Sequence, residues 1–276
     1  MSNPTIAFIG AGNMAAALIG GLVADGTDPQ AIIACDPSST QREALNARFG
    51  IRTCDDNREA VAACDVLVLA VKPQVLQAVA QDLAAAVQQH QPLVVSIAAG
   101  VRSDTLEAWL GGNTALVRSM PNTPAMLQAG ATGLFANAKV SEVQREQAES
   151  VLRAVGLTRW VNDESLIDAV TAVSGSGPAY YFLVMEAMEA AARELGLDEQ
   201  SARLLTLQTA LGAARMAIES TEDPATLRQR VTSPGGTTEQ AILSFEKDDL
   251  RGLFARAMTA ARDRSVELSQ LLAEKD

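Results

Sequence analysis

Basic residues are scarce in this 276-residue sequence, where 22 Lys and Arg stand against 33 Asp and Glu and give a formal net charge of −11. Four of the basic residues are lysines, and no basic stripe runs along the chain. Nucleic-acid binding relies on clustered positive side chains that neutralise phosphates. The composition therefore predicts a soluble protein with no nucleic-acid partner.

Cysteines and long apolar runs are also rare. The three cysteines, Cys35, Cys54 and Cys64, form no C-x-x-C pair, which argues against a zinc site or a disulfide framework. We expect reduced thiols, no metal and a cytoplasmic location. The first residues lack the basic segment of a signal peptide. The apolar run at 66–71 is far too short to cross a bilayer, so no membrane association is expected.

The first part of the chain alternates short apolar runs with helix-like stretches, and this rhythm predicts a parallel sheet covered by helices with right-handed crossovers. The expected strands are 5–9, 31–35, 65–71, 93–97, 115–119, 131–136 and 156–160. The expected helices are 12–24, 38–49, 73–87, 103–110 and 141–154. We therefore expect a Rossmann-type α/β domain at residues 1–161.

Everything beyond Trp160 reads as helix, which predicts an all-helical domain at residues 162–276. Helix starts are expected at Asn162, Pro178, Asp198 and Pro224, and breaks at 174–177 and 233–236. The helices at 179–195 and 201–219 carry broad apolar stripes. Such stripes favour burial against a second subunit, and burial within one subunit is the alternative.

The segment that follows the first strand has the G-x-G-x-x-A pattern of a dinucleotide-binding turn. Gly10 permits the tight turn, Gly12 lets the backbone approach a pyrophosphate, and the small Ala15 lets helix and strand pack closely. The N-terminus of the following helix offers free N–H groups to the phosphates. The alternative is a glycine turn that is needed only for packing.

An acidic residue, Asp36, follows the second expected strand. An acid at this position usually bonds the ribose 2′-hydroxyl, which favours NADH. Ser38, Ser39, Thr40 and Arg42 come directly after it and are suited to a 2′-phosphate, so NADPH stays open. A helix cap is the other interpretation of Asp36.

The chemistry of hydride transfer limits the substrate. A ketone acceptor needs a proton donor, normally His, Lys or Tyr. The single histidine, His90, lies in a polar turn, and residues 156–246 contain no lysine. This absence argues against a β-hydroxy acid dehydrogenase, the first alternative. A protonated cyclic imine already carries positive charge, so positioning and electrostatics suffice.

Two glycine-containing segments of the helical part are suited to a small acidic ligand. At 231–239, Gly235 and Gly236 permit a nest of N–H groups beside a helix start, where a carboxylate fits. At 172–180, Gly175 and Gly177 permit close backbone approach. The alternatives are an ordinary helix–turn–helix and a helix kink. A non-catalytic dinucleotide sensor is a further rival, and it gives no reason for such a nest.

Five motifs, in order along almost the whole chain, resemble those of the pyrroline-5-carboxylate reductases. They are IGAGNMA at 9–15, AVKPQ at 70–74, RSMPNTP at 118–124, SGSGPAY at 174–180, and the signature at 232–246 with its core SPGGTT at 233–238. That family reduces 1-pyrroline-5-carboxylate to L-proline, the last step of proline biosynthesis, with NADPH or NADH. The resemblance implies a Rossmann domain followed by a helical dimerisation domain, and a homodimer that often assembles into a decamer.

The resemblance also implies site residues. The expected cofactor-binding residues are Gly10, Ala11, Gly12, Asn13, Met14, Asp36, Asn57, Ala70, Val71, Lys72 and Pro73. The expected substrate-binding residues are Ser176, Ser233, Gly235, Gly236, Thr237 and Thr238. Thr238 is the expected catalytic residue, near the imine nitrogen. Asp36 departs from the family pattern, because members that use NADPH often carry Ser or Asn there.

Overall fold

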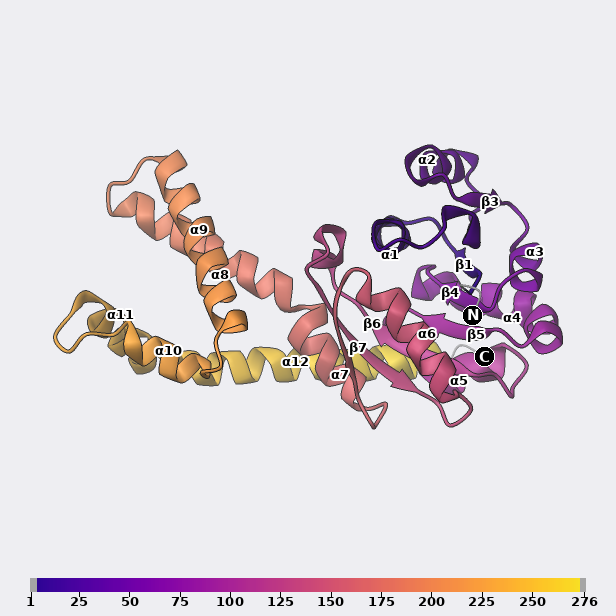
Figure 1. The fold of residues 1–276 in the computed structure, drawn as a ribbon. Coiled ribbons are helices and arrows are strands. Elements are labelled where there is room, and N and C mark those ends of the chain that lie inside the picture. Colours follow the sequence, from indigo (N-terminus) through magenta and orange to yellow (C-terminus); the bar gives the residue numbers. More distant parts are fainter. Residues whose placement is uncertain (1–3, 274–276) are drawn as a thin grey trace. The chain divides into compact units, whose positions relative to one another are not determined.

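The computed structural model describes residues 4–273, which contain an eight-stranded sheet in the order β3-β2-β1-β4-β5-β6-β7-β8 (Figure 1). All neighbouring strands are parallel except β6 and β7, which are antiparallel. The strands are β1 (Ile6–Ile9), β2 (Ile32–Cys35), β3 (Arg52–Cys54), β4 (Val66–Leu69), β5 (Leu93–Ser96), β6 (Leu116–Met120), β7 (Gly130–Ala136) and β8 (Gly156–Trp160). The expected Rossmann-type fold is confirmed.

Strands β1, β2 and β4 are apolar at every position because helices cover both faces of the sheet. In β1, Phe8 packs with α1 (Asn13–Ala24), α2 (Ser39–Phe49) and α6 (Glu142–Arg153) on one face. Its neighbour Ile9 packs with α3 (Asn57–Ala62), α4 (Pro73–His90) and α5 (Ser103–Trp109) on the other face. The two-residue period of a strand sends successive side chains to opposite sides and so builds two cores.

Three features of this domain differ from the expectation: strand β3, helix α3 and the direction of β7. β3 and α3 were not expected, because β3 has three residues, none of them fully buried, and α3 has six. Segments this short carry no readable hydrophobic period. The antiparallel pairing of β7 also departs from the parallel rhythm. A short helical turn, Thr123–Leu127, joins β6 to β7, and parallel neighbours need a much longer crossover.

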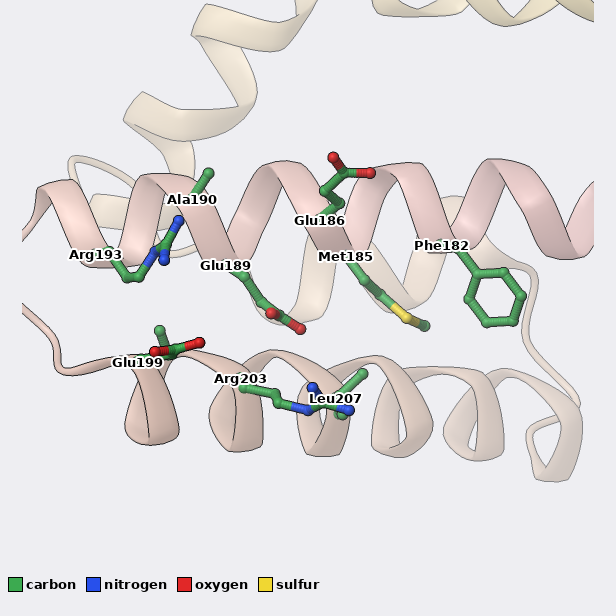
Figure 2. Close-up of a pocket in the computed structure, with 10 residues that line it drawn as sticks. Phe182, Met185, Glu186, Glu189, Ala190, Arg193, Glu199, Arg203 and Leu207 are labelled. Atoms are coloured by element: carbon green, nitrogen blue, oxygen red, sulfur yellow. The ribbon is translucent and has the colours of Figure 1, made fainter.

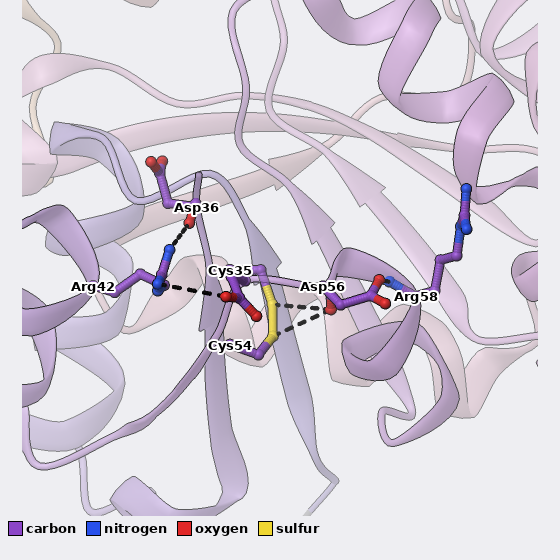
Figure 3. The surroundings of a disulfide bond; sticks show 7 residues. Cys35, Asp36, Arg42, Cys54, Asp56 and Arg58 are labelled. Carbon is purple, nitrogen blue, oxygen red and sulfur yellow. Dashed lines mark hydrogen bonds and ion pairs between the residues drawn. A yellow bond between two sulfur atoms is a disulfide. The ribbon is translucent and has the colours of Figure 1, made fainter. Parts of the chain in front are cut away.

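Cys35 and Cys54 form a disulfide, so the expectation of reduced thiols is wrong for two of the three cysteines (Figure 3). The cysteines are opposite each other in the pairing of β2 with β3, with their Cα atoms 4.9 Å apart. Because β3 was not recognised from the sequence, nothing there indicated that the two residues are neighbours. Cys64 is a free thiol.

Helices make up the chain beyond β8, as expected. They are α7 (Leu166–Val170), a π-helical turn (Thr171–Gly175), α8 (Gly177–Glu194), α9 (Glu199–Glu219), α10 (Pro224–Arg230), α11 (Thr237–Lys247) and α12 (Leu250–Ala273). The N-cap at Asp198 and the helix start at Pro224 are confirmed. The start at Asn162 is wrong. Asp163 accepts hydrogen bonds from the Ser165 N–H and hydroxyl, both at 2.8 Å, and this turn delays the helix to Leu166.

By packing, the chain forms two compact units. The sheet unit contains the described residues up to Ser176 together with the end of α12 from Ala261, and the helical unit is Gly177–Ala260. The boundary after residue 161 follows the change from strands to helices and stays a proposal. Helix α7, just beyond that boundary, packs on β7, where a Cβ at Gly133 would lie 2.6 Å from a Val170 methyl group. No described helix is long and apolar enough to cross a membrane.

A buried ionic cluster ties together four elements of the sheet unit. Arg118 of β6 is 2% exposed, and its guanidinium lies 3.1 Å from Glu164 and 3.7 Å from Asp168 of α7. Glu164 also accepts from the N–H and hydroxyl of Ser103 at the start of α5, both at 2.6 Å. Asp168 accepts from the Ser265 hydroxyl of α12 at 2.7 Å.

Replacing Arg118 by Met is expected to lower the free energy of unfolding by about 3–5 kcal/mol, because Asp168 would remain buried without a cation and Glu164 would keep only the partly exposed Arg102, 3.8 Å away. Chemical denaturation measures this change. The control is Arg145→Met, which removes an arginine stacked 4.1 Å from the Trp160 ring and should cost about 1 kcal/mol or less. Equal losses of unfolding free energy in the two variants would show that the buried cluster contributes no more to stability than the Arg145–Trp160 contact does.

Candidate coenzyme and substrate sites

The turn after β1 lies where the strand order reverses, between β2 and β4, which is where open α/β sheets bind ligands. The Gly10 N–H donates to the Cys35 carbonyl at 2.7 Å, and the Ala70 N–H donates to the Ile9 carbonyl at 2.8 Å. Ile9 is paired with both Cys35 and Leu69. Gly10, Asp36 and Ala70 therefore follow directly from three paired residues at one edge of the sheet.

Gly10 is required by the geometry of this turn. Its φ of +101° is in the region that favours glycine, and a Cβ there would lie 2.7 Å from the Ala70 carbonyl oxygen. A side chain at this position would force apart the ends of β1 and β4.

Gly12 and the start of α1 leave an open cradle. Gly12 is the N-cap of α1, no side chain caps it, and no acidic residue lies in the first turn. A Cβ at Gly12 would meet no atom within 4 Å, and Gly12 and Asn13 are both exposed. The first N–H groups of a helix lack intrahelical acceptors, so they remain free for an anion. The cradle fits the pyrophosphate of a dinucleotide.

Asp36 organises the loops beside this cradle. Its two carboxylate oxygens accept from the N–H groups of Ala11 and Ser38, both at 2.9 Å. The N-cap of α2 is Ser38 itself, whose hydroxyl accepts from the Gln41 N–H, so Asp36 is not the helix cap. Arg42 donates to the Asp36 carbonyl at 2.6 Å, so a guanidinium lies beside the position expected for the ribose (Figure 3).

The remaining expected cofactor residues lie at neighbouring strand ends. Asn57 is the first residue of α3 and follows the N-cap Asp56. Pro73 is the first residue of α4, as expected, and the exposed Lys72 is its N-cap. Their strands, β3 and β4, flank the β2–β1 pair. The structure thus places the expected cofactor residues at or just beyond the ends of four neighbouring strands, β3, β2, β1 and β4.

Ser176 lies at the end of a π-helical turn that a neighbouring motif holds in place. Its N–H donates to the Thr171 carbonyl at 2.8 Å. The Asn122 amide donates to the Ser174 carbonyl and accepts from the Ala131 N–H, both at 2.9 Å. Asn122 had no assigned role, although its motif was noted. The link between the motifs at 118–124 and 174–180 is visible only in three dimensions.

The segment before α11 forms a tight turn in the helical unit. Gly235 has φ +72°, and its N–H donates to the Glu239 carboxylate at 2.8 Å. The Gly236 N–H donates to the Ser233 carbonyl at 3.0 Å. The N–H groups of Gly235 and Gly236 therefore already donate to acceptors of the protein itself, and they do not form the expected open nest for an anion.

The free donors of this turn are at the helix start. Gly236 is the N-cap of α11, no side chain caps it, and the first N–H groups of the helix lack intrahelical acceptors. The half-buried Thr238 lies in this first turn, and Thr237 beside it is exposed. An anion seated here would meet N–H groups, the positive end of the helix dipole and a hydroxyl.

Comparisons with known proteins assign both parts of the chain. Residues 164–268 match the family model described as pyrroline-5-carboxylate reductase dimerisation, and residues 5–100 match the one described as NADP oxidoreductase coenzyme F420-dependent. A pyrroline-5-carboxylate reductase of Pseudomonas aeruginosa is 56% identical over 274 residues, covering 99% of this chain and 100% of the relative. The chain belongs to the pyrroline-5-carboxylate reductase family.

Solved structures agree with this assignment. A pyrroline-5-carboxylate reductase from Coxiella burnetii superposes with a TM-score of 0.94 at 49% identity, covering 97% of this chain and 99% of the other. A pyrroline carboxylate reductase from Plasmodium falciparum, with NADP bound, gives 0.84 at 27% identity and covers 98% and 99%. The expected family, reductase activity on pyrroline-5-carboxylate and nicotinamide cofactor are confirmed. The β-hydroxy acid dehydrogenase and the non-catalytic sensor are set aside.

The surface of the helical unit carries many exposed hydrophobic side chains. Among the hydrophobic side chains described between Gly177 and Ala260, only Ala202 is buried. Helices α8 and α9 border a groove of about 390 Å³, into which Met185 and Glu189 point from α8, and Arg203 of α9 also lines it (Figure 2). The groove contains none of the expected site residues.

Exposed apolar side chains are abundant on these two helices, and they include Tyr181, Phe182, Leu183, Leu204, Leu205, Leu211 and Ile218. So large an apolar surface is typical of a subunit interface.

Proposed function

We propose that this reductase reduces the C=N bond of 1-pyrroline-5-carboxylate to give L-proline, using the cradle at Gly10–Met14 for NAD(P)H and the turn at Ser233–Thr238 for the substrate. The uncapped, open start of α1 at the reversal of strand order carries the proposal, because it is shaped for a pyrophosphate. When bound, the coenzyme supplies the hydride.

On the substrate side, the first turn of α11 holds the carboxylate through its free N–H groups, and the Thr238 hydroxyl accepts a hydrogen bond from the protonated ring nitrogen. This positions the electrophilic carbon without a strong acid, which agrees with the absence of lysine from residues 156–246. In the sheet unit, the turn that contains Ser176 is held by Asn122, and Ser176 remains a proposed substrate contact. Orientation of a substrate that is already charged is the main contribution of these residues.

A direct assay tests this function. Purified protein with 1-pyrroline-5-carboxylate is expected to consume the absorbance of reduced nicotinamide with NADPH, NADH or both. β-Hydroxy acids with oxidised coenzyme serve as the negative control, and they are expected to give no turnover. No turnover of the pyrroline with either coenzyme would overturn the proposal.

The proposed assembly is a homodimer formed through the helical unit. The alternative is a larger oligomer in which dimers associate further, up to a decamer. The exposed apolar side chains of α8 and α9 support the dimer, since they need a cover that the unit itself does not supply. Sedimentation or light scattering determines the number of subunits. The cytoplasmic location also stays a proposal.

Asp36 is proposed to favour NADH, because a carboxylate repels a 2′-phosphate. We expect Asp36→Ser to raise the ratio of kcat/KM for NADPH over NADH about tenfold, which corresponds to ~1.4 kcal/mol. The matched control is Asp55→Ser, since Asp55 lies 3.9 Å from Arg42, is 80% exposed and does not bond the Gly10–Gly12 turn. An unchanged ratio for Asp36→Ser would leave Asp36 with only its role in holding the loops.

A further inference from the structure

The Cys35–Cys54 disulfide joins two segments that both carry expected coenzyme residues. Cys35 ends β2 and precedes Asp36, and Cys54 ends β3, three residues before Asn57. The bond therefore joins the ends of two neighbouring strands, on the side of the β1 turn where the adenosine ribose is expected.

Main-chain atoms at or near the two cysteines contact both segments. The Cys35 carbonyl accepts the Gly10 N–H at 2.7 Å, which fixes the dinucleotide turn. On the other side, the Asp56 carbonyl oxygen lies 3.4 Å from Cys54 Sγ and 3.9 Å from Cys35 Sγ (Figure 3). A change at the sulfur atoms thus reaches both the turn after β1 and the start of α3.

Strand β3 is an edge strand of three residues. Apart from the disulfide, it is held by its pairing with β2 and by the fully buried Ile51 that precedes it. Across the same gap, Arg42 lies 3.9 Å from Asp55, whose side chain is 80% exposed. Exposed ion pairs of this kind contribute little. The covalent bond is therefore the strongest link between the Asp36 loop and the Asn57 segment.

The bond is also accessible from one side. Cys35 is fully buried, whereas Cys54 is half-buried and lines a surface hollow of about 200 Å³ together with Glu59 and Ala63. A small thiolate entering this hollow meets Cys54 Sγ first, with Cys35 as the leaving group.

We propose that Cys35 and Cys54 form a reversible redox switch that sets the affinity of the coenzyme site. A dithiol reductant attacks Cys54 Sγ, the S–S bond breaks and Cys35 leaves as a thiolate that takes up a proton. The second thiol of the reductant then resolves the mixed disulfide. In balance, one protein disulfide and one dithiol give two protein thiols and one oxidised reductant, and a small-molecule disulfide as oxidant reverses the exchange. The inference rests on the proposed coenzyme site.

The oxidised form holds the ends of β2 and β3 in the geometry seen here, and reduction lets the Asp36 loop and the start of α3 move apart. We expect the Kd of the reduced coenzyme to rise about five- to tenfold on reduction, in the lower part of the range for coupled sites. The value of kcat should stay nearly constant, because Thr238 and the substrate turn are far from these residues in the sequence and belong to the other compact unit.

The test compares coenzyme binding, by nicotinamide fluorescence, after treatment with dithiothreitol and with oxidised glutathione. Alkylation of the unfolded protein should count three thiols in the reduced form and one in the oxidised form. Cys54→Ser should bind with the Kd of reduced wild type under both treatments. Cys64→Ser is the matched control and should keep the full response, because burial raises the pKa of the Cys64 thiol to about 12 and keeps it from acting as a thiolate.

Three thiols after oxidation, or equal Kd values in forms that carry one and three thiols, would overturn the switch. An absence of coenzyme binding in both forms would overturn the proposed function, and the switch with it.

Discussion

Gly12→Ala is expected to weaken coenzyme binding about 10–150-fold, because the added methyl group occupies the space through which the backbone N–H groups reach the pyrophosphate. Loss of one charge-assisted hydrogen bond corresponds to ~1.5–3 kcal/mol, and ~1.4 kcal/mol changes an affinity tenfold. Fluorescence titration with NADH and NADPH measures the effect.

The fold itself should tolerate this change. Gly12 has an ordinary φ of −73°, and a Cβ there would meet nothing within 4 Å. Replacing an N-cap glycine by alanine costs about 1 kcal/mol or less. Gly10→Ala is the informative contrast, since its Cβ would lie 2.7 Å from the Ala70 carbonyl oxygen and should damage stability and binding together. A Gly12→Ala protein that binds coenzyme like the wild type would show that the pyrophosphate lies elsewhere.

The second large effect is expected at Thr238. Thr238→Ala removes the hydroxyl proposed to bond the imine nitrogen and should lower kcat/KM for 1-pyrroline-5-carboxylate about 10–150-fold, from the same ~1.5–3 kcal/mol. The Kd of the coenzyme should not change, because the expected coenzyme residues belong to the sheet unit and Thr238 to the helical unit.

Thr238→Ser keeps the hydroxyl and should retain activity within about threefold, whereas the alanine variant should not. This pair separates a hydrogen bond from simple packing, since serine lacks the methyl group of threonine. Equal losses for alanine and serine would assign Thr238 a packing role only, and unchanged kinetics in both would remove it from the site.

Local patterns were sufficient to predict much of this molecule. The apolar runs of β1, β2 and β4 and the glycine turn at Gly10–Ala15 carry their own signals, since strands buried on both faces must be apolar throughout. The start of α11 after Gly236 also follows from local residues. The position of the three strand ends and the glycine turn at one edge of a Rossmann sheet follows from the usual strand order of such folds.

The features that were missed depend on contacts between distant residues. The Cys35–Cys54 disulfide requires β3, a strand too short to show a period. The role of Asn122 requires its neighbour Ser174, 52 residues away. The bond from the Gly235 N–H to Glu239 was also unforeseen, because a glycine pair predicts a concavity and does not say which acceptor fills it. Tertiary contacts, unlike turn chemistry, leave little trace in a single sequence.

The most direct measurement of the central claim follows one hydrogen atom. Coenzyme deuterated at both C4 positions of its reduced nicotinamide is turned over with unlabelled 1-pyrroline-5-carboxylate, and the product is analysed by mass spectrometry. The account predicts L-proline with a single deuterium at C5, the former imine carbon. Proline without deuterium, or no proline while coenzyme is consumed, would contradict it.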